Sequence, residues 1–286
     1  MNILPFDFFL ALVTSPFLRS ALFAGLAASF ASGMISPYIV VKRIVSITGS
    51  IAHAVLGGIG FAVFLQSRWH LPFLTPMIGA LAAGLFSALL MGWIHLKYKE
   101  REDTIIAVVW AAGMSLGIIF LALSPGYNGE LLNFLFGNIL WVSSGDLKLL
   151  LCLNGVILGS IALLYRRFLA LCFDEEHARL QGAPVALLYL ILLCLVALSV
   201  VVLIQVVGAI LLITLLAIPA AIASTLSMRL AGLMGIATGL SILFNTVGLY
   251  LSYQWNWPPG ATIALVAVST YLLSLIRKKR GYSFNG

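Results

Sequence analysis

The chain has few charged residues for its length. Charged side chains make up 9% of the 286 residues, whereas soluble proteins carry about 25%. So few charges cannot cover the surface of a soluble globule of this size. Long polar stretches are also missing. The composition therefore excludes a soluble enzyme and a disordered chain, and it leaves no room for a separate soluble ATPase or ligand-capturing domain.

Cysteine and catalytic motifs are also scarce. The three cysteines, Cys152, Cys172 and Cys194, are isolated and form no CxxC pair, which argues against a disulfide framework or a zinc knuckle. No Walker motif, GxGxxG or HExxH is present. Residues 113–117, Gly-Met-Ser-Leu-Gly, match the nucleophile-elbow pattern. They lie within a uniform apolar helical run instead of a strand, turn and helix, so we expect no catalysis there.

Long apolar runs dominate the sequence, since 62% of the residues are hydrophobic. A helix needs about 20 apolar residues to cross a bilayer. These runs do not alternate apolar with polar residues, which favours helices over a barrel. We predict an all-α, polytopic helical membrane protein with eight or nine transmembrane helices and a single domain over residues 1–286. The predicted spans are 20–41, 47–66, 74–96, 104–123, 147–165, 184–204, 207–227, 230–252 and 260–276.

Some segments fit this pattern less well. The sixth and seventh spans are separated only by Gln205 and Val206, so they could form one broken pair. Pro219 predicts a kink or break within the seventh span. Residues 1–18 are too short and interrupted to span, and we expect an interfacial segment. Residues 131–142 are apolar but also too short, which favours an interfacial or re-entrant half-helix.

The basic residues indicate the orientation of the chain. The net charge is +7, and the cations lie at the ends of apolar runs. This pattern is typical of membrane orientation, so we predict a lipid partner and no nucleic acid. With a cytoplasmic C-terminus and nine spans, the inner segments hold 13 of the 16 Lys and Arg residues. Those segments are 42–46, 97–103, 166–183, 228–229 and 277–286.

His53 lies near the middle of the second predicted span, with Ser50 one turn before it on the same face. An ionisable group at this depth is costly and usually faces the bundle interior or a water-filled path. Imidazole is also a common ligand of transition metals. His53 is therefore our candidate residue for a substrate path, and a histidine bonded to a neighbouring helix is the alternative.

Residues 173–182 form an unusually acidic stretch between two spans, because three of the nine acidic residues lie there. Asp174 is placed to cap a helix, although His177 stands where a capping box would have Glu or Gln. Gly182, followed by Pro184, ends the helix. We predict a short charged helix on the inner face that contacts a cytoplasmic partner. Its candidate contact residues are Asp174, Glu175, Glu176, His177, Arg179 and Gly182.

Taken in order, several motifs resemble those of the integral-membrane permeases of ABC importers for zinc, manganese and iron. The family stretch Arg-x-x-x-x-Gly-Asp-x-x-x-His is similar to residues 43–53, where Arg43 and His53 keep their separation but Gly49 occupies the aspartate position. The other matching stretches are 101–104, 136–140, 173–182, Gln205-x-x-Gly208, 219–221 and 259–262.

This resemblance implies an ABC importer permease fold in a bacterial cytoplasmic membrane. It implies a transported divalent ion of zinc, manganese or iron and no permanently bound cofactor. The partners would be cytoplasmic ATP-binding subunits, a second permease subunit and an external metal-binding protein. His53 would line the metal route, and residues 173–182 would dock on the ATPase, which alone would hydrolyse ATP. The missing aspartate leaves His53 without an adjacent anion.

Two other functions are alternatives. A secondary transporter driven by protons or sodium would normally carry carboxylates within its spans, but all nine acids here lie at or beyond span ends. A membrane-embedded enzyme could use Ser115 or His53, but no second catalytic residue stands at membrane depth. The identity of the metal and the choice between homodimer and heterodimer stay open at this point.

Overall fold

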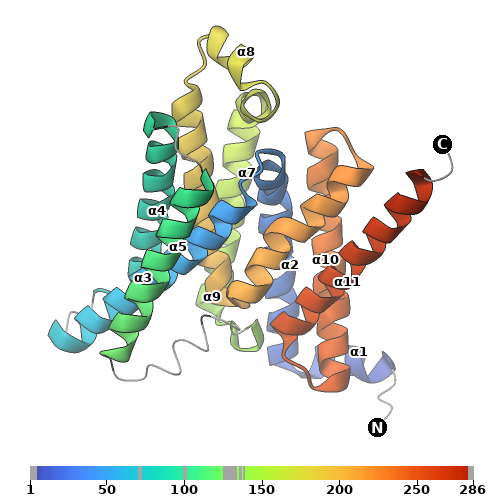
Figure 1. The fold of residues 1–286 in the computed structure, drawn as a ribbon. Helices are drawn as coiled ribbons and strands as arrows, with labels where there is room; N and C mark the ends of the chain where they lie inside the picture. The colour runs from blue at the N-terminus through green and yellow to red at the C-terminus, as the bar shows by residue number, and fades with distance from the viewer. Residues whose placement is uncertain are drawn as a thin grey trace. The chain divides into compact units, whose positions relative to one another are not determined.

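The structure is a computed structural model that describes residues 5–69, 73–98, 102–124, 134, 137 and 139–282 (Figure 1). Over these residues it contains helices and no strand, and eight of the helices are long and apolar enough to cross a membrane. The predicted all-α polytopic fold is therefore confirmed. The elements are α1 (Pro5–Thr14), α2 (Pro16–Val41), α3 (Val45–Trp69), α4 (Pro76–Tyr98), α5 (Glu102–Ala122), η1 (Ile139–Trp141), α7 (Ser144–Phe173), α8 (Glu175–Leu180), α9 (Val185–Leu226), α10 (Leu230–Trp255) and α11 (Pro259–Tyr282).

Most predicted spans match these helices within a few residues, but α7 extends well past its predicted end at residue 165. It begins with a capping box, in which the Asp146 N–H donates to Ser143 Oγ at 3.1 Å and the Ser143 N–H donates to Asp146 Oδ2 at 3.0 Å. It continues through Arg166 and Arg167 to Phe173. The two arginines interrupt the apolar run without interrupting the helix, because arginine is a good helix former.

The sixth and seventh predicted spans lie in one interrupted helix, α9. The backbone leaves the helical conformation at Gly208, with φ 79° and ψ 167°, two residues after the predicted boundary at Gln205 and Val206. Its dihedral angles stay helical at Pro219, where the sequence predicted a kink or break. Glycine suits this position because a side chain disfavours positive φ. The structure therefore has one helix that is interrupted near the predicted boundary, and its two parts correspond to the two predicted spans.

The chain divides into two compact units. The first contains Met1–Pro37, Phe136–Asn154 and Val206–Gly286, and the second contains Tyr38–Leu135 and Gly155–Gln205. Helices α2, α7 and α9 each contribute residues to both units. Both candidate sites predicted from the sequence, His53 and residues 173–182, lie in the second unit.

In the second unit, α3 packs against α4 and α5 through glycines (Figure 1). A Cβ on Gly113 of α5 would lie 2.5 Å from the Cα of Ala54, and a Cβ on Gly57 would lie 2.9 Å from the Gly113 carbonyl oxygen. Such contacts bring helix backbones together, as small residues do in membrane proteins. The glycine-flanked serine pattern at 113–117 is thus a packing motif, and Ser115 itself is exposed.

The first unit contains α10 packed on α11, together with the first part of α2. The Asn245 side chain donates to Ser29 Oγ at 2.7 Å, which joins α10 to α2. Phe8 of α1 packs edge-on against Tyr250 and Tyr253 of α10, at centroid distances of 5.2 and 5.6 Å. The interfacial position of residues 1–18 stays a prediction. The predicted half-helix at 131–142 falls largely outside the described residues, and its end forms η1.

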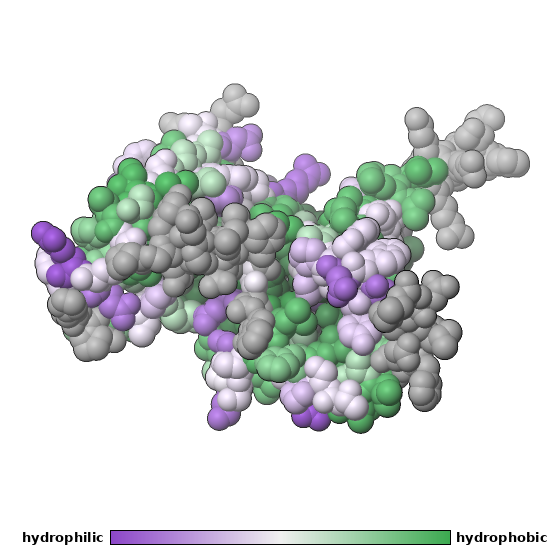
Figure 2. Space-filling model, turned by 90° about the horizontal axis from the view of Figure 1, so that it is seen from below, coloured by the Kyte–Doolittle hydropathy of each residue, from purple (hydrophilic) through white to green (hydrophobic). Residues whose placement is uncertain are grey.

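Large apolar side chains lie on the surface of many helices. Leu163 is 85% exposed and Phe86 is 67% exposed. Figure 2 shows hydrophobic side chains, in green, reaching the surface beside groups of hydrophilic ones. Water would make this exposure unfavourable, whereas lipid tails are as apolar as these side chains. The surface therefore agrees with a multi-pass membrane protein.

Candidate functional site

His53 lies on the glycine-rich helix α3 and is half-buried. Its imidazole stacks on the indole of Trp110 from α5, with ring centroids 4.4 Å apart and an interplanar angle of 19°. The close approach of α3 and α5 at Ala54 and Gly113 brings these two rings into contact. This pairing could not be predicted from the local sequence, because Trp110 lies in a different predicted span.

The imidazole has an unused polar atom. Nδ1 of His53 is buried and has no hydrogen-bond partner among the described residues. Ser50 does not supply one, since its hydroxyl donates to the Ile106 carbonyl oxygen at 3.0 Å. Gly49 has no side chain to supply one either. A buried polar atom without a partner is costly and calls for an explanation, so this is the position on α3 that a ligand would satisfy.

The space beside Gly49 is open enough for a small side chain. A Cβ built there would meet Trp110 Cζ3 at 3.6 Å, an ordinary van der Waals distance. The described residues contain no group of three or more His, Cys, Asp or Glu side chains that could hold a metal ion. His53 therefore offers a single nitrogen donor from this chain, without an acidic neighbour on its own helix turn.

Residues 173–182 contain a helix, α8 (Figure 1), and its polar groups make defined hydrogen bonds. Asp174 is the N-cap, and its Oδ1 accepts from the His177 N–H at 2.8 Å. At the other end Gly182 has φ 77°, and the Ala183 N–H donates to the Ala178 carbonyl oxygen at 3.0 Å. These are the bonds of a Schellman motif. Both ends of α8 are therefore fixed by the sequence itself.

The side chains of α8 divide into inward and outward groups. Glu175 pairs with Lys42 at 2.9 Å, and the buried Ala178 anchors the helix. Glu176 and Arg179 are exposed. Leu180 is 82% exposed, and sequence reasoning did not single it out. The outward surface of α8 thus combines charge with one large apolar side chain.

The predicted site residues do not form one centre. Those of α8 lie together because they share one short helix, whereas His53 makes no hydrogen bond or ion pair with α8 among the described residues. The side chain of His177 instead lies 2.8 Å from Gln181 Nε2. Any communication between α8 and His53 must pass through other residues.

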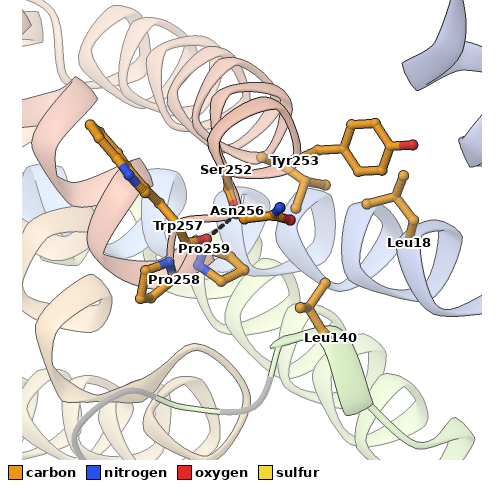
Figure 3. Close-up of a pocket in the computed structure, with 9 residues that line it drawn as sticks. Leu18, Leu140, Ser252, Tyr253, Asn256, Trp257, Pro258 and Pro259 are labelled. Atoms are coloured by element: carbon orange, nitrogen blue, oxygen red, sulfur yellow. Dashed lines mark hydrogen bonds between the residues drawn. The ribbon is translucent and has the colours of Figure 1, made fainter. Parts of the chain in front are cut away.

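A separate cavity of about 410 Å³ lies in the first unit where α10 ends (Figure 3). Ser252 closes the turn there by donating to the Trp257 carbonyl oxygen at 2.7 Å, and Asn256 adopts the left-handed conformation. The described lining residues include no His, Cys, Asp or Glu. Trp255 and Trp257 have their rings 4.8 Å apart and are about half exposed, as in an interfacial aromatic belt.

Comparison with known proteins identifies the family. Residues 14–278 match the ABC 3 transport family. The chain belongs to this family. The resemblance predicted from the motifs is confirmed, and the chain is a membrane permease of the ABC 3 family.

Relatives within the family are similar over nearly the whole chain. The probable metal transport system membrane protein of Chlamydia pneumoniae is 49% identical, covering 90% of this chain and 87% of its own. The manganese transport system membrane protein MntC of Listeria monocytogenes is 31% identical, covering 94% of both chains. The solved structure of PsaBC from Streptococcus pneumoniae in complex with Fab matches with a TM-score of 0.83 and 28% identity, over 95% of each chain.

Proposed function

We propose that this chain is the membrane subunit of an ATP-driven importer of divalent transition-metal ions, with zinc, manganese or iron as its substrate. Family membership gives the permease role, and relatives named for metal transport support the choice of substrate. The observation that carries the proposal is His53, a half-buried histidine in a membrane-length helix whose Nδ1 has no partner.

His53 would act as a transient ligand. One imidazole holds a metal ion weakly, because first-row metals in proteins usually take four or more ligands. A second permease subunit would bring further ligands to the same route. The absence of a carboxylate at Gly49 then has a purpose, since a conducting site must release the ion that it binds. The Trp110 indole holds the imidazole plane and so fixes the direction of its nitrogens.

Helix α8 would receive the force of ATP hydrolysis from separate cytoplasmic ATP-binding subunits. Its outward groups, Glu176, Arg179 and Leu180, supply charge and an apolar contact for such a partner. Asp174 and Gly182 would serve the same end indirectly, because they fix the two ends of the helix. In this arrangement α8, and with it the C-terminus, faces the cytoplasm of a bacterial cell, and an external metal-binding protein delivers the ion.

A secondary transporter is not favoured. The described carboxylates Asp103, Asp146 and Glu175 lie in the first turns of helices, where the helix dipole suits them. Such positions give these carboxylates local roles and do not form a proton or sodium path across the bilayer.

The test of the metal route is His53→Ala in cells that depend on this importer. We expect uptake of radioactive manganese or zinc to fall to about a tenth of the wild-type rate, since losing one metal ligand costs at least about tenfold. Ser115→Ala is the control, because Ser115 is exposed and lies on the neighbouring helix α5. Unchanged uptake by His53→Ala at wild-type expression would remove His53 from the route. Loss of uptake in Ser115→Ala would favour the membrane-embedded enzyme.

The test of the coupling surface is co-purification of the ATP-binding subunit with α8 variants. Leu180→Asp places a charge at the exposed apolar position, and Glu176→Lys reverses a charge beside it. Both should reduce the amount of ATP-binding subunit retained, with the larger loss for Leu180→Asp. Leu163→Asn, at an 85% exposed position on α7 within the membrane, is the control for general damage. Full retention by both α8 variants would place the ATPase elsewhere.

A further inference from the structure

Four helices of the second unit meet at one cation, Lys42. Its Nζ donates to Glu175 Oε2 of α8 at 2.9 Å and to the Leu171 carbonyl oxygen of α7 at 3.0 Å. It also lies 5.9 Å from the centre of the Tyr189 ring on α9. Lys42 itself directly follows the last residue of α2. The lysine side chain is only 15% exposed, although it carries a full charge.

These contacts are those of a structural anchor. Leu171 lies in the last turn of α7, where carbonyl oxygens lack an N–H partner within the helix. Lys42 donates a hydrogen bond to this carbonyl oxygen and also pairs with Glu175, the first residue of α8. Charge-assisted hydrogen bonds of this kind are among the strongest in proteins, and low exposure protects them from salt screening. The start of α8 is therefore tied to the end of α2.

The segment after Lys42 is short and stiff. The Ile44 N–H donates to the Ile39 carbonyl oxygen at 2.9 Å, and the Arg43 N–H donates to Val40 at 3.1 Å. Arg43 occupies the left-handed conformation with φ 59°, where most helices of this ending have glycine. Ile44 is buried, and α3 begins at the next residue. Because this connection is short and hydrogen-bonded, a displacement of Lys42 would be passed on to the start of α3.

Helix α3 carries His53, two turns after its start. Because α3 contacts α5 backbone to backbone, a shift of α3 would carry α5 and the His53–Trp110 stack with it. The path from α8 to His53 thus consists of one ion pair, one tight turn and one rigid helix. Each element lies in the second unit.

We propose that Lys42 is the positioning residue that transmits movement of α8 to the α2–α3 turn and so to His53. This inference rests on the proposed function, in which α8 receives the force of ATP hydrolysis. Glu175 is then an internal link of the permease, and Glu176 and Leu180 are the groups left for the ATPase. The assignment differs from the sequence-based prediction, which treated Glu175 and Glu176 alike.

The experiment uses the complete importer, with its ATP-binding subunits and external binding protein, reconstituted in liposomes. It measures ATP hydrolysed per manganese or zinc ion taken up, together with the unfolding temperature of the complex. The variants are Lys42→Met, Lys42→Arg, Glu175→Ala and the double variant of Lys42→Met with Glu175→Ala. Arg68→Met, an exposed cation at the end of α3, is the control.

Lys42→Met should retain the ATP-binding subunit and hydrolyse ATP, but the ATP used per ion should rise about tenfold, the effect expected when one charge-assisted bond is lost. Lys42→Arg keeps the charge and should stay within about twofold of the wild type. The double variant should resemble Lys42→Met, because two partners of one bond act as a unit.

Three results would overturn the inference. One is a wild-type ATP-to-ion ratio in Lys42→Met. Another is a parallel fall of hydrolysis and uptake, which indicates a purely structural role. The third is a double variant in which the effects of the two single substitutions on the ATP-to-ion ratio add.

If Lys42→Met does not assemble, Glu175→Ala tests the same ion pair from its half-exposed side. Failure of the proposed function is distinct, because the wild-type complex would then retain no ATP-binding subunit or carry no metal.

Discussion

Helices α3 and α8 are held in place by different forces. Helix α3 is fixed by steric contact, with glycines that bring its backbone against α4 and α5. Helix α8 is fixed by polar bonds, with a carboxylate cap at one end, a left-handed glycine at the other and an ion pair to Lys42 between them.

The polar groups of the two helices also differ in whether they have hydrogen-bond or ion-pair partners. On α8 the polar side chains Asp174, Glu175 and His177 each have a partner within the chain. On α3 the central polar group, His53 Nδ1, has none. The difference teaches where a ligand can act. We propose that α8, with its satisfied polar groups, acts as a rigid lever, and that the unsatisfied His53 is the point on α3 where a ligand binds.

The largest effect is expected from Gly113→Val, which disrupts the close packing of α3 against α5. The new Cβ would lie 2.5 Å from the Ala54 Cα, and backbone cannot move aside as a side chain can. Overpacking of this kind costs about 1–3 kcal/mol or more, so most of the protein should be lost to aggregation. Size-exclusion chromatography in detergent measures the recovered fraction. Gly159→Val is the control, since nothing lies within 4 Å of a Cβ there. Equal recovery of the two variants would contradict the steric account of α3.

The next effect should come from giving His53 the neighbour that it lacks. Gly49→Asp places a carboxylate one turn before His53, in space that accepts a Cβ. A carboxylate oxygen as a second ligand beside the imidazole nitrogen should raise the metal retained by the purified complex by about tenfold and slow its release. Elemental analysis of complexes loaded with manganese or zinc measures the retained ion. Gly49→Asn supplies the same shape without the charge. If both variants retain equal amounts, His53 does not contact the transported ion.

A smaller effect is expected from removing one polar bond of α8 with Asp174→Ala. Loss of an N-cap costs about 1 kcal/mol, so amide exchange within Glu175–Leu180 should become about fivefold faster. Hydrogen–deuterium exchange should show no change in α3, because the Asp174 cap bonds within α8 and the Lys42–Glu175 ion pair stays in place. Glu176→Ala, on the exposed side of α8, is the matched control. Faster exchange throughout both helices would show that α8 supports α3 more than the contacts suggest.

The smallest effect should come from Arg179→Met. Arg179 lies 3.8 Å from Glu175, and the two side chains are 69% and 43% exposed. Exposed pairs at this spacing are worth at most about 0.5 kcal/mol, so the unfolding temperature should move by no more than about 1 °C. Lys42→Met should lower it more, because its ion pair is far less exposed. Equal shifts for the two variants would mean that burial does not distinguish the two ion pairs.

The sequence predicted the helices better than the contacts between them. Apolar run length is a local property, so spans such as α3 and α10 could be placed within a few residues. The capping of α8 by Asp174 and its end at Gly182 are also local and were predicted correctly. The break in α9 lies at Gly208, two residues after the predicted boundary at Gln205 and Val206, because Gly208 adopts dihedral angles that residues with a side chain disfavour. Pro219, where the sequence also predicted a kink or break, lies inside the helix.

The candidate sites were less predictable because their partners are distant in the chain. His53 could be singled out as an ionisable group in an apolar run, but its Trp110 neighbour comes from another helix. Ser50 was expected beside His53 and instead bonds to Ile106 of α5. From the sequence, Lys42 could be interpreted only as one of several cations at the end of a span. Its partner Glu175 is 133 residues away in the chain. Such pairs arise from helix packing, which a single sequence does not encode in its local pattern.

The break at Gly208 has a consequence for the sidedness of the protein. An uninterrupted helix of 42 residues would be about 63 Å long, twice the roughly 30 Å of a hydrocarbon core. The residues on either side of Gly208 each suffice for one crossing. If α9 crosses twice, the described helices supply nine crossings, the number predicted from the sequence, and the N- and C-terminal ends would lie on opposite sides of the membrane. In that topology one residue without a side chain, Gly208, would decide the parity of the crossings.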